Sequence, residues 1–477
     1  MNTKLRAWRN PEAIPPDVSG DTAHGGQVSL EGMHRSVHVP HHQAGFWEQW
    51  RAFVGPAILV SVGYMDPGNW GTDLQSGAQF KYGLLWVVGL ASLMAIFMQV
   101  ISARLGVVTG KDLAQCCRDW YPPWSRWPNW LMSEVAIGAC DLAEVLGSAV
   151  ALNLLFHIPL LWAVIITGMD VLLLLALQRF GMRTIEAVVL LLVATIGVCY
   201  FIEIFIIPQT RPSFLEMGRA LVSPHFRQSG MLYIAVGIIG ATVMPHNLYL
   251  HSALVQSRRL QKDEPSIRRA IRFNNIDSIA ALTIAFFINA AILVLAAMVF
   301  FGKESTTIAG GQIVTFTADS DWIRVAYLTL APLLGASVAS TLFAVALLAS
   351  GQSSTITGTL AGQVVMEGFM HWRIKPWVRR LITRTLAILP AVFVIGLRGD
   401  SSVTDLLILS QVVLALQLPF AMFPLLHFTS SHKRMGAWKN GRFLLIVGWG
   451  SAILITAMDL CGLPESLRAA WKVIIGG

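Results

Sequence analysis

The chain alternates between long apolar stretches and short polar connections along most of its 477 residues. An apolar run of about 20 residues is long enough for an α-helix to cross a bilayer. A scan at this length finds eleven such segments, and we expect each to form a transmembrane helix. Their approximate ranges are 48–78, 83–103, 129–154, 158–178, 184–207, 230–254, 277–301, 327–350, 381–398, 405–427 and 441–461. The pattern therefore predicts an all-α polytopic membrane protein with 11 transmembrane helices.

Helix-breaking residues interrupt the first and the sixth of these segments. The interruptions read Asp66-Pro67-Gly68-Asn69 and Met244-Pro245-His246-Asn247. Proline lacks a backbone donor and clashes with the preceding turn, so a helix that reaches it tends to unwind and to leave carbonyls without helical partners. An ordinary turn between two short helices is the alternative. The apolar run from Phe53 to Tyr64 is too short to span a bilayer alone, however, so such a turn would lie inside the membrane.

Broken helices at corresponding positions of two halves are typical of transporters built from an inverted repeat, which bind their substrate near the membrane midplane. We therefore expect a 5+5 inverted repeat with broken helices 1 and 6, followed by one additional helix. The predicted parts are a disordered cytoplasmic tail (1–46), helices 1–5 (47–207), an extracellular loop (208–229), helices 6–10 (230–427), and helix 11 with the C-terminus (428–477).

Composition and charge agree with a membrane protein and give it an orientation. Hydrophobic residues make up 55% of the chain and charged residues 13%, outside the range of ordinary soluble domains. The net charge of +8 does not indicate nucleic-acid binding, because 20 Lys and Arg residues lie in alternate loops and only 7 in the remaining loops. The positive-inside rule then places the N-terminus in the cytoplasm and the C-terminus outside. The chain has no N-x-S/T acceptor for N-glycosylation, which favours a bacterial inner membrane. Its five cysteines show no metal-ligand spacing, so we expect them to be free thiols.

The two interruptions carry groups that can bind a metal. An aspartate near mid-bilayer costs about 2.5–3.5 kcal/mol on insertion scales, so Asp66 is a candidate ion or substrate site. Asn69 offers an amide oxygen, the unwound backbone near Gly63 and Ala241 offers carbonyls, and Met244 offers a thioether. Oxygen ligands alone suit Mg²⁺ or Ca²⁺, whereas a sulfur ligand favours Mn²⁺, Fe²⁺ and softer ions.

A second group of polar residues lies in the third and sixth segments. Glu134, Asp141 and Glu144 are spaced by seven and three residues, which puts them on one helical face. With His246 and His251 they suggest a proton relay, since histidine titrates near neutral pH. Buried interhelical hydrogen bonds are the alternative. Five other acids lie near segment ends or alone, and we interpret them as interfacial or structural: Asp170, Glu203, Asp277, Asp405 and Asp459.

These motifs resemble the Nramp family (natural resistance-associated macrophage proteins), proton-coupled importers of divalent transition metals with the amino-acid/sodium symporter-like fold. The resemblance covers nearly all of residues 50–460. The motifs that carry it are Gly55-Pro56, Asp66-Pro67-Gly68-Asn69, Asp141-Leu142-Ala143-Glu144, Met244-Pro245-His246-Asn247, His251-Ser252-Ala253-Leu254, Gly351-Gln352-Ser353-Ser354-Thr355, Ser410-Gln411-Val412-Val413 and Gln417-Leu418-Pro419-Phe420.

The resemblance implies a role for particular residues. Asp66, Asn69, Met244 and the carbonyl of Ala241 would bind the ion, and Gln411 would approach it in some states. Proton coupling would involve the following residues: Asp66, His246, Glu134, Asp141, Glu144, Arg258 and Arg384. Gly63, another candidate carbonyl ligand, departs from the family pattern, in which many relatives have alanine.

We therefore expect a proton-coupled importer of Mn²⁺ or Fe²⁺, also accepting Cd²⁺ and Co²⁺, that works by alternating access. A related Mg²⁺ transporter is one alternative, although Met244 argues against it. A sodium-coupled amino-acid transporter is another, although a bound carboxylate would oppose Asp66. A channel or a metal-sensing receptor is less favoured, and we expect no enzyme and no permanently bound cofactor. The expected partners are the metal ion, protons and the lipid bilayer, with the protein a monomer.

Overall fold

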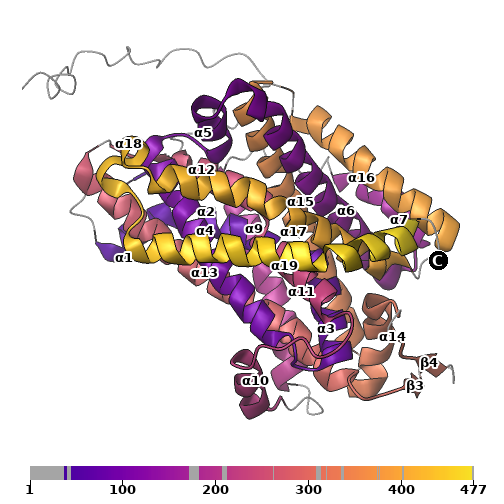
Figure 1. The fold of residues 1–477 in the computed structure, drawn as a ribbon. Helices are drawn as coiled ribbons and strands as arrows, with labels where there is room; N and C mark the ends of the chain where they lie inside the picture. The colour runs from indigo at the N-terminus through magenta and orange to yellow at the C-terminus, as the bar shows by residue number, and fades with distance from the viewer. Residues whose placement is uncertain are drawn as a thin grey trace, which may run out of the picture.

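The computed structural model shows a bundle of long α-helices (Figure 1). It describes residues 37–39, 45–170, 182–206, 212–261, 263–307, 313–317, 320–334, 338–372, 374, 376–399 and 402–474.

The first half of the bundle runs from the N-terminal segment to residue 206. Its helices are α1 (Phe46–Phe53), α2 (Pro56–Gly63), α3 (Pro67–Phe80), α4 (Leu85–Thr109), α5 (Leu113–Trp120), η3 (Pro123–Ser125), α6 (Arg126–Phe156), α7 (Leu160–Thr167), α9 (Met182–Phe201) and the π-helical turn η4 (Ile202–Ile206).

The second half begins at residue 214. Its helices are α10 (Phe214–Leu221), α11 (Met231–Val243), α12 (Pro245–Leu254), η5 (Val255–Ser257), α13 (Glu264–Val299), α14 (Trp322–Leu334), α15 (Ala339–Met370), α16 (Pro376–Arg398), α17 (Val403–Ser430), α18 (His432–Met435), η7 (Gly436–Trp438) and α19 (Arg442–Ile474).

Both predicted interruptions are present. The first segment is divided into α2 and α3, and the sixth into α11 and α12, with a proline at the first position of the second helix in each case. Proline is tolerated there because the first residues of a helix donate no intrahelical hydrogen bond. The helix breaks therefore lie where the sequence predicts them.

The other predicted segments agree with the helices to differing extents. Within the described residues, nine helices are long and apolar enough to cross a membrane. They do not include the broken first segment, whose parts α2 and α3 are each too short, or the predicted span 158–178, much of which lies outside the described residues. The prediction for 327–350 is wrong in its bounds, because α14 ends at Leu334 and the long helix α15 begins at Ala339. The count of 11 and the inverted repeat remain predictions.

The connections lie at two opposite ends of the bundle. Figure 1 shows α5 and α18 at one end, and α10 with the antiparallel pair β3 (Ser305–Thr307) and β4 (Ile313–Thr315) at the other. The first end carries loops that were predicted to be cytoplasmic, and the second carries loops that were predicted to be outside. The alternation of the loops thus follows the charge pattern.

Part of the predicted disordered tail is ordered. Residues 37–38 form β1, which pairs in parallel with β2 (Arg258–Arg259) directly after α12. Val39 packs beside Phe53 and Phe273, which stack at 5.4 Å. The prediction of disorder across 1–46 is therefore wrong at these residues, because the short segment Val37–Val39, within a polar tail, gains backbone partners and an apolar contact from distant parts of the chain.

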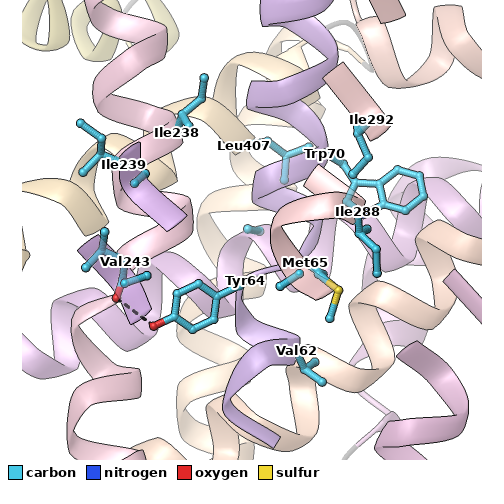
Figure 2. Close-up of a cluster of buried hydrophobic side chains, with 14 of the residues drawn as sticks. Val62, Tyr64, Met65, Trp70, Ile238, Ile239, Val243, Ile288, Ile292 and Leu407 are labelled. Carbon is cyan, nitrogen blue, oxygen red and sulfur yellow. Dashed lines mark hydrogen bonds between the residues drawn. The ribbon is translucent and has the colours of Figure 1, made fainter. Parts of the chain in front are cut away.

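The long helix α6 packs against α15, α16 and α17. Close approach between α6 and the first break requires a glycine, since a Cβ at Gly147 would come within 2.1 Å of the Pro67 ring. A layer of apolar side chains surrounds the breaks, and Figure 2 shows Tyr64, Met65 and Val243 within it. The two unwound turns are therefore enclosed in protein.

Candidate functional site: the two helix breaks

The first break exposes a carboxylate at the beginning of a helix. Asp66 has extended backbone and caps α3, accepting a hydrogen bond at 2.9 Å from the backbone N–H of Asn69 through Oδ1. Its other oxygen, Oδ2, is buried and has no hydrogen-bond partner among the described residues. The positive end of the α3 dipole stabilises the negative charge of this side chain, which leaves one oxygen for a ligand.

The second break depends on an unusual backbone at Met244. This residue has φ 37° and ψ 107°, a conformation that L-residues rarely adopt, and its side chain is fully buried. Such strain persists only where the surrounding structure holds it, and it is common at binding sites. Here it aims the chain from α11 into α12 and leaves the thioether between the two half-helices.

The prolines also explain which backbone carbonyls are available. In an α-helix the carbonyl of residue i accepts from the N–H of residue i+4. The residue four places after Gly63 is Pro67, and the residue four places after Ala241 is Pro245, neither of which has an N–H. The two carbonyls that sequence reasoning nominated as ligands are therefore those whose helical donors the prolines remove.

The structure brings the end of α2 against the beginning of α12. A methyl group at Gly63 would come within 2.2 Å of Asn247 Nδ2 and 3.1 Å of Met244 Sδ. Asn247 Nδ2 in turn lies 3.4 Å from Met244 Sδ, to which it donates a hydrogen bond. Sequence reasoning missed Asn247 as a member of the site, although its place three residues after Met244, like that of Asn69 after Asp66, was a signal that could have found it.

Gln411 on α17 joins the same site from the opposite side. A methyl group at Gly68 would come within 2.0 Å of the side-chain Nε2 atom of Gln411. A methyl group at Gly240 on α11 would come within 1.9 Å of the backbone carbonyl oxygen of Gln411. These glycines let α17 approach both half-helices closely. The side chain of Gln411 is fully buried, and its Oε1 has no hydrogen-bond partner among the described residues.

The oxygens around the breaks are the ones that a cation would use. Four buried side-chain oxygens at the site have no hydrogen-bond partner within the described residues: Asp66 Oδ2, Asn69 Oδ1, Asn247 Oδ1 and Gln411 Oε1. A buried acceptor without a donor costs about 1–3 kcal/mol, so such a set indicates a place where a ligand supplies the missing contacts. In the described parts of the chain, no three His, Cys, Asp or Glu side chains are grouped so that they could hold a metal ion together, and the donors at the breaks are a single acid with otherwise neutral groups.

Neighbouring helices fix the first unwound turn. Asn289 on α13 donates to the carbonyl of Tyr64 at 2.7 Å, and Ser350 on α15 donates to the carbonyl of Met65 at 2.5 Å. The hydroxyl of Tyr64 contacts the carbonyl of Val243 at 3.5 Å, which links the two breaks directly (Figure 2). The turn is therefore held by side chains in place of helical hydrogen bonds.

A hydrogen-bonded chain leads from Tyr64 to one of the predicted relay histidines. Gln99 on α4 donates to the Tyr64 hydroxyl at 2.6 Å, and its Oε1 lies 2.9 Å from His251 Nδ1. His251 is thus linked to the site through Gln99. His246 lies directly after the Met244–Pro245 break and is 2% exposed, and it interacts electrostatically with Asp141.

The carboxylates of α6 are paired with arginines of α16. Arg380 forms ion pairs with Asp141 and, at 3.1 Å, with Glu144, and all three side chains are buried. Glu144 also accepts hydrogen bonds from Ser354 at 2.8 Å and Thr355 at 3.1 Å. Sequence reasoning missed Arg380, although it lies four residues before Arg384 and therefore on the same face of α16.

Arg384 also belongs to this network, and its proposed part in proton coupling remains a prediction. It lies 3.4 Å from Glu144 and forms an ion pair with Asp170. Of the two roles expected for Asp170, interfacial or structural, the structure favours the structural one, because Asp170 is 8% exposed and is paired within the network. Nothing local in the sequence indicates this pairing, which joins residues 214 positions apart.

The remaining predicted residues lie at the edges of the network or outside it. Glu134 pairs with Arg379 at 2.9 Å and accepts from Trp130, near the α5 end of α6. Arg258 lies elsewhere, where its guanidinium donates to the carbonyls of Ala52 at 3.1 Å and Val54 at 2.7 Å.

Arg258 also forms an ion pair with Glu186 at 3.0 Å. Asp277 accepts from the backbone N–H groups of Gly55 and Ala57, so it caps α2 and has the structural role expected for it. Arg258 and Asp277 therefore fasten the beginning of α2 to α13 and to the segment after α12, and Arg258 is not part of the carboxylate network on α6.

The sequence is similar to known metal transporters. The family model described as "Natural resistance-associated macrophage protein-like" matches residues 57–463. The chain is 50% identical over 441 residues to a divalent metal cation transporter MntH of Nostoc sp., covering 92% of this chain and 96% of the relative. It is 48% identical over 457 residues to a protein of the same name from Listeria innocua, covering 95% and 96%.

The fold is also similar to a solved structure. A crystal structure of the Eremococcus coleocola manganese transporter in complex with an aromatic bis-isothiourea substituted compound superimposes with a TM-score of 0.81 at 39% identity. The match covers 92% of this chain and 91% of that one. Sequence, family model and fold agree over nearly the whole length, and the chain therefore belongs to the Nramp family.

Proposed function

We propose that this protein imports divalent transition metals, Mn²⁺ or Fe²⁺ and also Cd²⁺ and Co²⁺, together with protons. The membrane potential adds about 2.3 kcal/mol per charge per 100 mV to the inward movement of the cation. The proposal includes the inner membrane of a bacterium as the location, a cytoplasmic N-terminus, an external C-terminus and a monomer as the working unit.

The observation that carries the proposal is the donor set at the helix breaks. One carboxylate, neutral amide oxygens, two carbonyls without helical donors and one thioether lie at the meeting point of α2, α3, α11 and α12. A hard oxygen set with a single soft sulfur favours Mn²⁺, Fe²⁺ and Cd²⁺ over Mg²⁺ and Ca²⁺. The relatives named as divalent metal cation transporters and as a manganese transporter support this assignment.

The α6–α16 network supports the proton part of the proposal. Buried ionisable groups inside a membrane protein often mark proton pathways. His246 follows the metal-site residue Met244 by two positions and interacts electrostatically with Asp141, which is paired with Arg380. A proton released near Asp66 would then have titratable groups to receive it along His246, Asp141, Glu144 and Glu134.

Alternating access is the third part of the proposed function. The beginning of α2 is fastened by Arg258 and by Asp277, which bind backbone groups between Ala52 and Ala57. Loosening these contacts would let α2 move while α3 stays packed against α13 and α11. A half-helix that moves about an unwound turn opens the site to one side at a time.

Neither transporter alternative gains support from the site. A Mg²⁺ carrier should surround a hydrated ion with oxygens, whereas Met244 Sδ lies beside the Gly63 backbone. An amino-acid carboxylate at the N-terminus of α3 would meet the Asp66 side chain, which already occupies that position as the cap.

The test is transport by the full-length protein in proteoliposomes with a pH-sensitive dye inside. Asp66→Ala should abolish saturable Mn²⁺ uptake and the associated acidification in protein that is folded and inserted. Asp263→Asn, which alters an exposed aspartate that caps α13, is the matched control and should transport normally. Near-normal saturable uptake by Asp66→Ala would contradict the assignment of the site.

A further inference from the structure

A line of buried polar side chains continues from the metal site along α3. Asn69, Asp73 and Ser76 occur at positions i, i+4 and i+7, which places them on one face of the helix. All three are 1% exposed or less. The line begins at Asp66 and points toward the end of α3, on the side of the bundle where α10 and α14 lie (Figure 1).

Each member of this line has an oxygen without a hydrogen-bond partner among the described residues. These atoms are Asp66 Oδ2, Asn69 Oδ1, Asp73 Oδ2 and Ser76 Oγ. Each buried oxygen without a hydrogen-bond donor destabilises the fold by about 1–3 kcal/mol, so four of them along one helix face indicate that another group contacts them. A path that is filled by water or a cation during transport would satisfy them.

Asp73 differs from the buried acids of the α6–α16 network. Asp141, Glu144 and Asp170 are each held by an arginine. Asp73, in contrast, has no ion-pair partner within the described parts of the chain, and the carboxylate of Asp66 repels it. A buried carboxyl group without a fixed positive partner is suited to binding a mobile cation.

An aromatic cluster lies around Trp70, one turn before Asp73. Trp70 packs against Tyr200 at 5.1 Å and Phe343 at 5.2 Å between ring centroids. The hydroxyl of Tyr200 is buried without a hydrogen-bond partner in the described residues and interacts electrostatically with Asp73. Tyr200 therefore adds a second buried oxygen without a partner in the described residues to this region of α3.

We propose that Asp73, with Ser76 one turn further, forms a second cation-binding site, called the second station below, between the Asp66 site and the end of α3. The inference rests on the proposed function, since it states that the transported divalent metal binds transiently at Asp73 before it reaches Asp66. Seven residues of helix separate the two aspartates by about 10.5 Å along the axis. Two weak stations at such a spacing let an ion bind and still leave, as conduction through a series of sites requires.

The first test is Asp73→Asn, which removes the charge and keeps the size. The KM for Mn²⁺ uptake into proteoliposomes should rise about tenfold, the lower end of the gain that charge focusing gives, while the maximal rate changes by less than about twofold. Asp73→Glu should restore the KM. Gln75→Ala, on the opposite face of α3, is the control and should leave both constants unchanged.

The outcomes separate this inference from the proposed function. If Asp66→Asn stops Mn²⁺ uptake while Asp73→Asn leaves the KM unchanged, the second station is wrong and the metal site stands. If Asp66→Asn transports normally, the proposed function itself fails. A fall in maximal rate at unchanged KM for Asp73→Asn would indicate a structural role and overturn the station.

A second variant tests the path without altering charge. Ser76→Cys, in a background that lacks the five native cysteines, should react with a membrane-impermeant thiol reagent added from the side on which α3 ends. Millimolar Mn²⁺ should slow the reaction, whereas Mg²⁺ should slow it less. An unreactive cysteine, or one whose labelling Mn²⁺ does not change, would contradict the proposal.

Discussion

The guanidinium of Arg380 lies 3.1 Å from the carboxylate of Glu144, a contact between two buried residues that are 236 positions apart in the chain. The same guanidinium is paired with Asp141. One arginine therefore compensates two carboxylates of α6 inside the bundle.

Arg380→Gln should destabilise the protein by about 3–5 kcal/mol, because removing one partner of a buried ion pair leaves an uncompensated charge. Thermal unfolding in detergent would measure the loss. Adding Asp141→Asn should recover part of it, and Arg442→Gln, an exposed arginine at the beginning of α19, is the control. An Arg380→Gln variant as stable as the control would show that the pairing does not hold the network.

Met244→Leu should alter the choice of metal, since leucine keeps the volume and removes the sulfur. We expect Cd²⁺ affinity to fall by about tenfold or more, a loss of about 1.4 kcal/mol, with a smaller change for Mn²⁺ and stronger competition by Ca²⁺ and Mg²⁺. Competition for uptake in proteoliposomes measures this. Met458→Leu, on α19 and in the same buried apolar cluster, removes a sulfur outside the helix breaks and should leave the competition profile unchanged.

His246→Gln should reduce metal-driven proton flux more than metal binding. The side chain lies beside the second break and interacts electrostatically with Asp141, but it is not among the nominated ligands. Calorimetric Mn²⁺ affinity and dye-reported acidification should therefore diverge, and Asp141→Asn should behave in the same way. Equal losses in both measurements would favour a structural role for the network.

Arg258→Gln should loosen the beginning of α2, because it removes donors to the carbonyls of Ala52 and Val54 and the ion pair with Glu186. In a background with Ala241→Cys and no other cysteine, labelling from the cytoplasmic side should increase several-fold. Arg259→Gln, the exposed neighbour, is the matched control. Labelling from both sides at once would indicate a channel and contradict alternating access.

Asp112 should give the stability a pH dependence. It caps α5 outside the predicted spans, and burial raises its pKa from 3.8 to about 7. Between these values the folded protein binds more protons than the unfolded chain, so this contribution to stability falls as the pH rises from 4 to 7. Asp112→Asn keeps the cap and removes the titration, so the melting temperature of the wild type relative to the variant should be higher at pH 4.5 than at pH 7.5. A constant difference would show that Asp112 does not titrate in this range.

The sequence by itself determined the helix breaks and most of the long apolar helices of this protein. Pro67 and Pro245 remove the donors of Gly63 and Ala241 in any fold in which these segments are helical, because the i+4 relation is a property of the helix itself. The apolar runs likewise predicted nine helices that are long enough to span within the described residues, and the motifs at the breaks indicated the family. Periodicity within α6 also placed its three carboxylates on one face.

Contacts between distant segments decided the rest. Nothing near Asp170 in the sequence indicates Arg384, and the ion pair exists because α16 packs against both α6 and α7. The division between α14 and α15, the strand pairing of residues 37–38 with 258–259, and the close approach of Gln411 to Gly68 are of the same kind. Hydrophobic pattern and helix-breaking residues act over one or two turns, whereas the partner of a buried charge is chosen by which helices pack together, and only the tertiary structure determines that packing.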